Sequence, residues 1–444
     1  MRIASFLTAS LLVLAATGAD AAPKIVMISI DGLRPADVLE ADKRGIEVPN
    51  LKALVRDGAS ATGVRGVLPT VTYPSHTTLL TGTAPAAHGV VNNLTFDPAR
   101  INQAGWYWYA TDIKVETLWD AAEKAGRKTA NVHWPVSVSA NADLNLPQIW
   151  RTGHEDDRKL MAALATPGLL PALESHCGHY AQGIDESIEG DENRAKFGIR
   201  LIETEQPDFI TLYWTALDHE QHQYGPGTPQ AHAVLKRIDA LVGQAVAAAR
   251  KVDPGAIVAI VSDHGFAPLH TELNVPRAFV EAGLITLDDK GAVTAWEAMP
   301  WPSGGSGAVV LARPDDKALE EKVGALLARL AADPANGIAK IYDRAAMAAV
   351  GANPQASFYV AFKAGFAMGY DPTKPMLSPS KSKGTHGYAP DMPEMRATFI
   401  IAGAGVPKAR SLGDIDMRDI APTIAALGGL TLPTAEGRVL LGNR

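Results

Sequence analysis

Three short apolar runs, each followed by an aspartate, constrain the fold of this chain more than any other feature. The runs and their aspartates are Ile25–Ile30 before Asp31, Phe209–Trp214 before Asp218, and 256–261 before Asp263. Continuous apolar runs of this length are typical of strands buried on both faces of a parallel sheet. A helical pattern is clearest over 229–250, where five apolar residues fall on one face: Val234, Ile238, Leu241, Ala245 and Ala248. The alternation predicts a doubly wound α/β fold, a mostly parallel sheet with helices on both faces.

The aspartates are expected to meet at one edge of the sheet, because ligands of such folds gather at the carboxyl ends of the strands. Three histidines accompany them: His222 lies four residues after Asp218, His264 directly follows Asp263, and His386 lies between glycines in the segment GTHGY. Mixed carboxylate and imidazole donors suit zinc. A single aspartate at a strand end is usually a helix cap or turn residue, but the joint pattern favours a metal site.

Two segments, 137–193 and 270–384, show less regular periodicity than the rest of the chain. We expect both to be insertions that form a cap on a single domain spanning 22–444. Within the second segment, a helix is expected after Pro314, with these residues facing inward: Leu319, Val323, Leu326 and Leu330.

The N-terminus reads as a signal peptide over residues 1–21. An apolar stretch over 3–16 is followed by Ala19 and Ala21, which supply the small residues that precede a cut after position 21. The alternative, a membrane anchor, needs about 20 apolar residues. The only cysteine is Cys177, so no lipid anchor is expected at the cut and no disulfide within the chain. We therefore expect a periplasmic or secreted protein without a stable membrane anchor.

The net charge of −7 argues against a polymeric nucleic acid as partner, because no basic field exists to hold a long phosphate backbone. Small anionic ligands remain compatible with this charge, since a metal site supplies positive charge locally.

The segment around Thr72 places a hydroxyl at a predicted helix start. Pro74 suits the first turn of a helix, where its missing N–H costs nothing. The Thr72 hydroxyl would then stand at the positive end of the helix, where a phosphate is attracted. The alternative is that Thr72 is an ordinary N-cap whose hydroxyl bonds to the helix backbone.

Seven segments, in order along the chain, resemble one family. They are ISIDGLR at 28–34, TYPSH at 72–76, HGVVNN at 88–93, WP at 134–135, DHEQH at 218–222, SDHG at 262–265 and HGY at 386–388. With them the chain resembles the type I phosphodiesterase/nucleotide pyrophosphatase family of the alkaline phosphatase superfamily, from Lys24 to the segment 419–423. The resemblance implies an alkaline-phosphatase-like fold and a metal-dependent enzyme that hydrolyses phosphodiester or pyrophosphate bonds in a small phosphodiester or nucleotide substrate.

The resemblance also implies a role for each residue at a site with two Zn²⁺. One ion would be held by Asp218, His222 and His386, and the other by Asp31, Asp263, His264 and the oxygen of Thr72. Thr72 would be the nucleophile that forms a covalent phosphothreonine intermediate, since zinc favours the alkoxide as it lowers the pKa of bound water. Asn93 would donate its side-chain amide to a phosphoryl oxygen.

Tyr73 and Tyr213 lie where the resemblance places aromatic side chains that bind a base or another leaving group. Ordinary core packing is the alternative for both. His76 and His88 are expected to be structural or to act through other side chains, because the ligand set is complete without them. The chain departs from the family pattern at three positions, where phenylalanine, asparagine and glycine are usual: Tyr73, Ser75 and Gln221. These departures bear on substrate preference more than on chemistry.

Three alternative functions make different demands on the sequence. A phosphate monoesterase on the same scaffold would present an extra Arg or Lys to the phosphate, and no such residue lies near Asn93 or after Trp134. A sulfatase that modifies a cysteine would need Pro and Arg at fixed places after it, and neither follows Cys177 there. A non-catalytic periplasmic zinc-binding protein would retain the ligands without needing Thr72 or Asn93.

Overall fold

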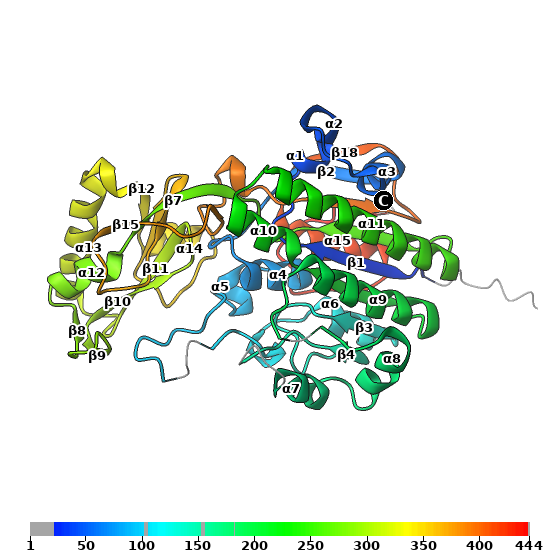
Figure 1. Cartoon of the computed structure of the whole chain (residues 1–444), viewed down its shortest axis with the longest axis horizontal. Helices are drawn as coiled ribbons and strands as arrows, with labels where there is room; N and C mark the ends of the chain where they lie inside the picture. Colours follow the sequence, from blue (N-terminus) through cyan, green and yellow to red (C-terminus); the bar gives the residue numbers. More distant parts are fainter. Residues whose placement is uncertain (1–21, 102–104, 152–155, 182, 443–444) are drawn as a thin grey trace, which may run out of the picture.

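A computed structural model describes residues 22–101, 105–151, 156–181 and 183–442. The predicted signal peptide, residues 1–21, lies outside the described residues. The described chain forms two lobes, a large one around a central sheet and a small one made by residues 267–385 (Figure 1). No helix among the described residues combines the length and the apolar character that a membrane span requires.

The large lobe is built on an eight-stranded sheet with the order β18-β2-β17-β6-β1-β5-β3-β4. Its strands are β1 (Ile25–Ile30), β2 (Ala59–Arg65), β3 (Thr129–Val132), β4 (Leu144–Leu146), β5 (Phe209–Trp214), β6 (Ile257–Val261), β17 (Phe399–Ala402) and β18 (Arg410–Asp416). Only β17 runs antiparallel to its neighbours. The three strands predicted from the apolar runs are therefore confirmed as β1, β5 and β6, side by side at the centre of a mostly parallel sheet.

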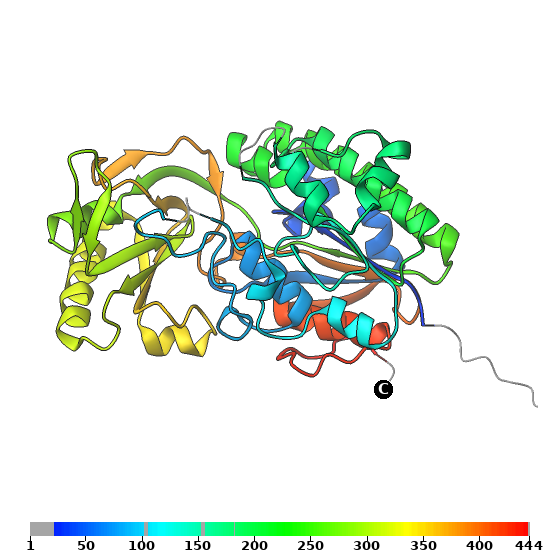
Figure 2. The same ribbon diagram turned by 90° about the horizontal axis from the view of Figure 1, so that it is seen from below.

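Helices cover both faces of this sheet (Figure 2). Alternate side chains of β1 enter different apolar cores: Val26 and Ile28 pack with α3, α9 and α11, whereas Ile25 and Met27 pack with α4, α6 and α15. The helices of the large lobe are α1 (Ala36–Leu39), α2 (Ala41–Arg44), α3 (Pro49–Asp57), α4 (Thr72–Thr81), α5 (Pro85–His88), α6 (Leu118–Lys124), α7 (Asp156–Leu164), α8 (Leu169–Cys177), α9 (Ile188–Thr204), α10 (Ala216–Tyr224), α11 (Pro229–Val252) and α15 (Ile420–Leu427). The doubly wound architecture is thereby confirmed, and α11 matches the predicted helix.

The two segments without regular periodicity lie in different places. The strand and helices within 144–177 join the core of the large lobe, to which Leu146, Met161 and Leu170 belong. Residues 267–385 build the small lobe, which has apolar cores of its own. The predicted helix after Pro314 is α13, and Leu319, Val323 and Leu326 are buried in it.

The small lobe contains an antiparallel sheet of order β10-β11-β13-β12 and a second sheet of order β14-β7-β15, with β16 also pairing with β7. Its elements are β7 (Ala267–Leu273), α12 (Val275–Glu281), β8 (Ile285–Leu287), β9 (Val293–Trp296), β10 (Ala298–Pro302), β11 (Ser306–Leu311), α13 (Lys317–Ala332), β12 (Ile338–Tyr342), α14 (Arg344–Ala349), β13 (Phe358–Phe362), β14 (Gly365–Met368), β15 (Leu377–Pro379) and β16 (Gly384–Thr385). Because β6 leads directly into β7, the carboxyl ends of the central strands face the junction between the lobes (Figure 1).

Candidate active site

Three buried aspartates lie at the carboxyl ends of the central strands. Asp31 directly follows β1, Asp263 lies two residues after β6, and Asp218 lies in the first turn of α10, which begins just after β5. Since β1 pairs with both β5 and β6, these three strand ends are neighbours. The sheet therefore brings together carboxylates that are far apart in the sequence, as the strand pattern predicts.

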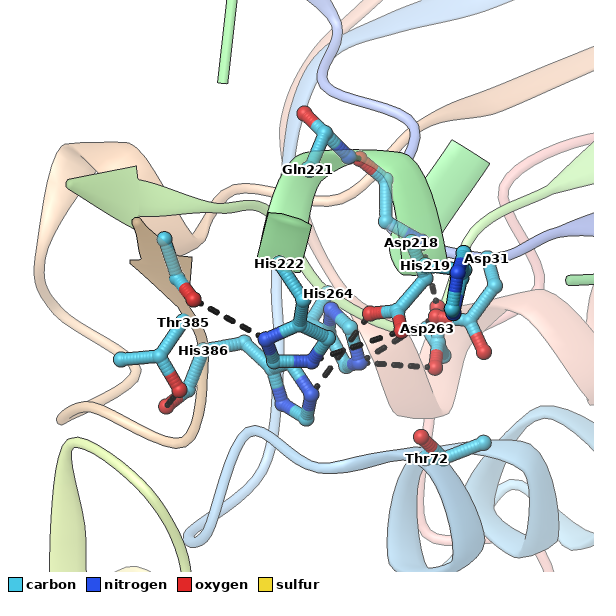
Figure 3. Close-up of polar contacts among 12 residues, drawn as sticks. Asp31, Thr72, Asp218, His219, Gln221, His222, Asp263, His264, Thr385 and His386 are labelled. Atoms are coloured by element: carbon cyan, nitrogen blue, oxygen red, sulfur yellow. Dashed lines mark hydrogen bonds and ion pairs between the residues drawn. The ribbon is translucent and has the colours of Figure 1, made fainter. Parts of the chain in front are cut away.

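Three histidines converge on the same place (Figure 3). His264 follows Asp263, and its ring stacks on that of His386 with 3.7 Å between the centroids. The Nε2 atoms of His386 and His222 lie 3.6 and 3.4 Å from the Asp218 carboxylate oxygens. His386 comes from the chain just after β16, so the border of the small lobe completes a cluster that otherwise belongs to the large lobe.

The ligand atoms form two overlapping groups that could each hold a metal ion. One group is Asp218, His264 and His386, and the other is Asp31, Asp263 and His264. The His264 Nε2 atom lies 3.3 Å from Asp31 Oδ1 and 3.0 Å from Asp263 Oδ2. The structure thus brings all six predicted side-chain ligands together, and the division of these ligands between two ions stays a prediction.

Several of these atoms have no hydrogen-bond partner among the described residues. They are Asp31 Oδ1, Asp218 Oδ1, Asp263 Oδ2 and His264 Nε2, all buried. A buried polar atom without a partner is costly, so clusters of such atoms in a native fold need an explanation. A divalent cation explains all of them at once, because each is a lone-pair donor of the kind that zinc binds.

Backbone carbonyl groups orient the three imidazoles for metal binding. Nδ1 of His222 donates to Gly384 O at 2.9 Å, Nδ1 of His264 to Gly265 O at 3.1 Å, and Nδ1 of His386 to Thr70 O at 3.2 Å. A carbonyl oxygen only accepts, so each Nδ1 carries the proton, and in the neutral ring Nε2 carries the lone pair. The same arrangement fixes metal-ligating histidines generally.

The electrostatics of the cluster also call for a cation. Burial, together with the charges of Asp263 and Asp218, raises the pKa of Asp31 well above its ordinary value. Burial likewise raises the pKa of Asp218. The pKa of His386 is held well below its usual range by burial and by the neighbouring His264 and His222. Burial thus disfavours charge on Asp31, Asp218 and His386, whereas Asp263 and His264 stabilise each other's charged forms, so that the pKa of Asp263 is lowered and that of His264 is raised. Positive charge between the carboxylates would favour the ionised forms of Asp31 and Asp218 and the neutral ring of His386.

Thr72 is the first residue of α4, and Pro74 lies in its first turn as predicted. The N-cap residue is Val71, and no side chain caps the helix, so the alternative that Thr72 is an ordinary N-cap is wrong. Figure 3 shows the Thr72 hydroxyl turned towards the carboxylates of the cluster. A hydroxyl that makes no capping bond and lies at a helix start beside a candidate metal cluster is well placed to attack a bound phosphate.

Asn93 is held at the start of α4, at the residue after Thr72. Its Oδ1 atom accepts the backbone N–H of Tyr73 at 2.8 Å. Because the carbonyl oxygen of the amide is occupied, the NH₂ group is the part of the side chain left to donate. This orientation supports the predicted contact with a phosphoryl oxygen.

Both predicted substrate-binding tyrosines are buried, with 1% of Tyr73 and 3% of Tyr213 exposed. The Tyr73 hydroxyl donates to Gln148 Oε1 at 2.6 Å, and its ring packs against Trp106 and Trp108. The Tyr213 hydroxyl donates to the Asp31 carboxylate. The burial of both rings favours the core-packing alternative. The hydrogen bond to Asp31 gives Tyr213 a different role, which is to hold a candidate metal ligand in place.

Other side chains support the cluster without joining either ligand group. His76 lies behind Thr72: its Nδ1 donates to Thr72 O at 2.8 Å and its Nε2 accepts from Ser29 Oγ at 2.8 Å. His88 is buried against Thr78, with 3.1 Å between Nε2 and Oγ1.

Gln221, which the sequence marks only as a departure from the family pattern, is part of the same support. Its Nε2 donates to Gly32 O at 3.0 Å, while the Gly32 N–H donates to Asp263 Oδ1 at 3.2 Å. Gln221 therefore joins α10 to the turn that carries Asp31. Sequence reasoning missed this link, because it depends on the contact between α10 and the turn after β1, which are far apart in the sequence.

Comparisons with known proteins point to the same family that the sequence motifs resemble. Residues 25–389 match the model of a family described as type I phosphodiesterase / nucleotide pyrophosphatase. An uncharacterized pyrophosphatase/phosphodiesterase of Schizosaccharomyces pombe is 26% identical over 258 residues, which cover 55% of this chain and 45% of that protein. The human bis(5'-adenosyl)-triphosphatase ENPP4 is 26% identical over 247 residues, 55% of this chain and 47% of that protein. This chain spans about half the length of these curated relatives.

Solved structures share the fold. Human ectonucleotide pyrophosphatase/phosphodiesterase 5 aligns with a TM-score of 0.67 and 19% identity, covering 95% of this chain and 100% of that chain. An inactive form of the murine protein in complex with AMP aligns with a TM-score of 0.67 and 17% identity, covering 95% and 100%. At such identities the likeness confirms the alkaline-phosphatase-like α/β fold.

Proposed function

This chain belongs to the type I phosphodiesterase/nucleotide pyrophosphatase family, and we propose that it hydrolyses phosphodiester or pyrophosphate bonds with Thr72 as the nucleophile. One observation carries the proposal: the hydroxyl of Thr72, which caps no helix, faces a buried cluster of carboxylates and imidazoles whose ligand atoms lack partners among the described residues. The name of the human relative, a bis(5'-adenosyl)-triphosphatase, supports a small nucleotide as the substrate.

Two Zn²⁺ are the proposed cofactors. Asp218, His222 and His386 would hold one ion, and Asp31, Asp263, His264 and the Thr72 oxygen would hold the other. Carboxylate and neutral imidazole are donors that zinc accepts, and each histidine offers Nε2 because its Nδ1 is bound to a backbone carbonyl. When bound, such ions supply Lewis acidity, which lowers the pKa of an oxygen nucleophile and stabilises negative charge on the leaving group.

The protein's own residues then perform two displacements. The Thr72 oxygen attacks phosphorus, a new P–O bond forms, and the leaving group departs with the electron pair of the bond that breaks. Water next attacks the phosphothreonine and restores the Thr72 hydroxyl. Each displacement inverts phosphorus, so the overall reaction proceeds with retention.

Asn93 stabilises the charge that builds on a non-bridging oxygen. Its NH₂ group is directed by the bond between its Oδ1 and the Tyr73 N–H, so no reorientation is needed when the charge develops. A fixed donor of this kind is worth about 3 kcal/mol in the transition state.

We propose a preference for diesters over monoesters, with a phosphate monoesterase as the second candidate. The segment after Trp134, which includes Val136 and Ser137, is buried and uncharged, so it offers no cation for the extra negative oxygen of a monoester. We also propose that the protein is exported, on the basis of its apolar N-terminal stretch and the word ectonucleotide in the names of its relatives.

The test is hydrolysis of bis-p-nitrophenyl phosphate, p-nitrophenyl phosphate and a dinucleoside polyphosphate by the purified protein. We expect the diester and the polyphosphate to be cleaved faster than the monoester, activity to disappear with a chelator, and Zn²⁺ to restore it. Faster cleavage of the monoester would favour the second candidate. Absence of hydrolysis by protein loaded with two ions would leave a non-catalytic zinc-binding protein.

A further inference from the structure

A fully buried ion pair in α9 contacts the start of α10, the helix that carries two of the candidate ligands. Asp191 and Arg194, both in α9, are 0% and 1% exposed, and Arg194 Nη2 lies 2.8 Å from Asp191 Oδ1. Neither residue belongs to a candidate ligand group. Taking an ion pair out of water is expensive, and apolar residues of similar size often stabilise a protein as well or better. The position of this pair therefore needs an explanation other than stability.

The pair caps α10 from a neighbouring helix. Asp191 Oδ1 accepts the N–H of Thr215 at 3.0 Å and Oδ2 accepts the N–H of Ala216 at 2.8 Å. Arg194 Nη2 donates to Thr215 Oγ1 at 3.0 Å. Thr215 is the N-cap residue of α10 and makes no capping bond with its own side chain. Two N–H groups at this helix end are thus satisfied by α9.

The same helix is fixed on another side by Gln221, which donates to Gly32 O. Asp218 lies only two residues after Ala216, in the first turn of α10, and His222 lies in the last turn. A shift or rotation of this short helix would therefore move both side chains relative to His386. Ligand geometry has to be held closely for a metal ion to bind well.

We propose that the Asp191–Arg194 pair is a positioning device, which sets α10 so that Asp218 and His222 together bind one of the two metal ions. The pair touches no ligand atom and acts through the backbone at the start of α10. This inference rests on the proposed two-metal function, and it assigns these residues to one ion of the two.

The chain offers a matched control in Asp239 of α11. Asp239 is 1% exposed and accepts the N–H groups of Asn50 and Leu51, at 3.1 and 2.8 Å, in the first turn of α3. It is therefore another buried carboxylate that satisfies the start of a neighbouring helix. No candidate metal ligand lies on α3.

The experiment is a Zn²⁺ titration against a competing chelator, with thermal unfolding, for wild type, Asp191→Asn and Asp239→Asn. We expect Asp191→Asn to weaken the binding of one of the two ions by about 10- to 100-fold, and excess Zn²⁺ to restore much of kcat. Asp239→Asn should lower the midpoint of unfolding and still bind both ions with wild-type affinity. Equal metal affinity in wild type and Asp191→Asn, or equal losses in both variants, would overturn the proposal.

A double variant covers the case in which Asp191→Asn leaves Arg194 unpaired and prevents folding. Asp191→Asn combined with Arg194→Met removes both charges, so we expect it to fold while one ion remains weakly bound. If this folded double variant binds both ions normally, the pair has no positioning role. Wild-type protein that binds two ions without hydrolysis would contradict the proposed function alone, and wild-type protein that binds none would contradict both.

Discussion

The carboxyl edge of the central sheet and the core of the small lobe are built in opposite ways. At the sheet edge, five buried titratable side chains and the partly exposed His222 face one another, and several of their atoms lack partners among the described residues. In the small lobe the core is apolar, and charged pairs such as Arg313 with Asp316 and Lys317 with Glu320 lie at the surface. Buried polar atoms without partners cost stability, so we expect the sheet edge to serve function and the apolar core to serve stability. Substitutions in the two regions should therefore have different consequences.

The largest effect is expected from Thr72→Ala. Because Thr72 supplies the attacking oxygen, kcat for the diester should fall by about 10⁴-fold or more. Metal content should stay at two ions, since the carboxylates and imidazoles are untouched. Steady-state kinetics with elemental analysis of the purified variant measures both. A variant that retains substantial activity would remove Thr72 from the reaction.

His264→Ala and His222→Ala test the proposed division of ligands between the two ions. His264 lies in a candidate group with Asp31 and Asp263, so His264→Ala should lose the ion that also binds the Thr72 oxygen and become as inactive as chelated wild type. His222→Ala should lose the other ion, because His222 lies beside Asp218. Metal content measured over a range of free Zn²⁺ distinguishes the loss of one ion from the loss of both. Loss of both ions from either variant would contradict the predicted division of ligands.

Asn93→Ala tests the charge stabilisation at the same edge. We expect kcat to fall by about 10²- to 10³-fold, as when one preorganised donor is removed. KM and metal content should change little, since the amide contact strengthens in the transition state. An effect confined to KM would show that Asn93 binds the substrate without stabilising the transition state.

Leu327→Ala in α13 tests the other region. Leu327 is fully buried in the core of the small lobe, so its truncation should lower the free energy of unfolding by about 2 to 5 kcal/mol. Below the unfolding transition, kcat/KM should remain within about twofold of wild type, because surface and core changes away from a site alter stability rather than chemistry. Denaturant unfolding and kinetics on the same sample compare the two. A large loss of activity in the folded variant would contradict the view that the core of the small lobe contributes to stability without affecting catalysis.

The features that sequence alone predicted are those with a local signature. The strands β1, β5 and β6 were predicted because each is a continuous apolar run, and α11 because its apolar residues recur at helical spacing. The aspartates and histidines of the cluster were predicted because each stands just after a strand or in a short motif. The convergence of these residues follows from parallel strands sharing one edge.

The features that sequence missed depend on contacts between distant segments. Tyr213 reaches Asp31 because β5 lies beside β1 in a fixed register, and that register cannot be read from either strand by itself. Gln221 contacts Gly32 only because α10 packs over the turn after β1. The capping of α10 by Asp191 likewise requires the packing of α9 against α10. Hydrogen bonds of this kind have no sequence spacing of their own.

The most direct test of the central claim is to trap the covalent intermediate. Protein loaded with Zn²⁺ is mixed with a phosphodiester, quenched in acid within the first turnover, digested, and examined by mass spectrometry. We predict that the retained half of the substrate is attached to Thr72, and that His264→Ala shows no such adduct. An adduct on another residue, or complete turnover without an adduct and with inversion at phosphorus, would contradict a threonine nucleophile facing a metal centre.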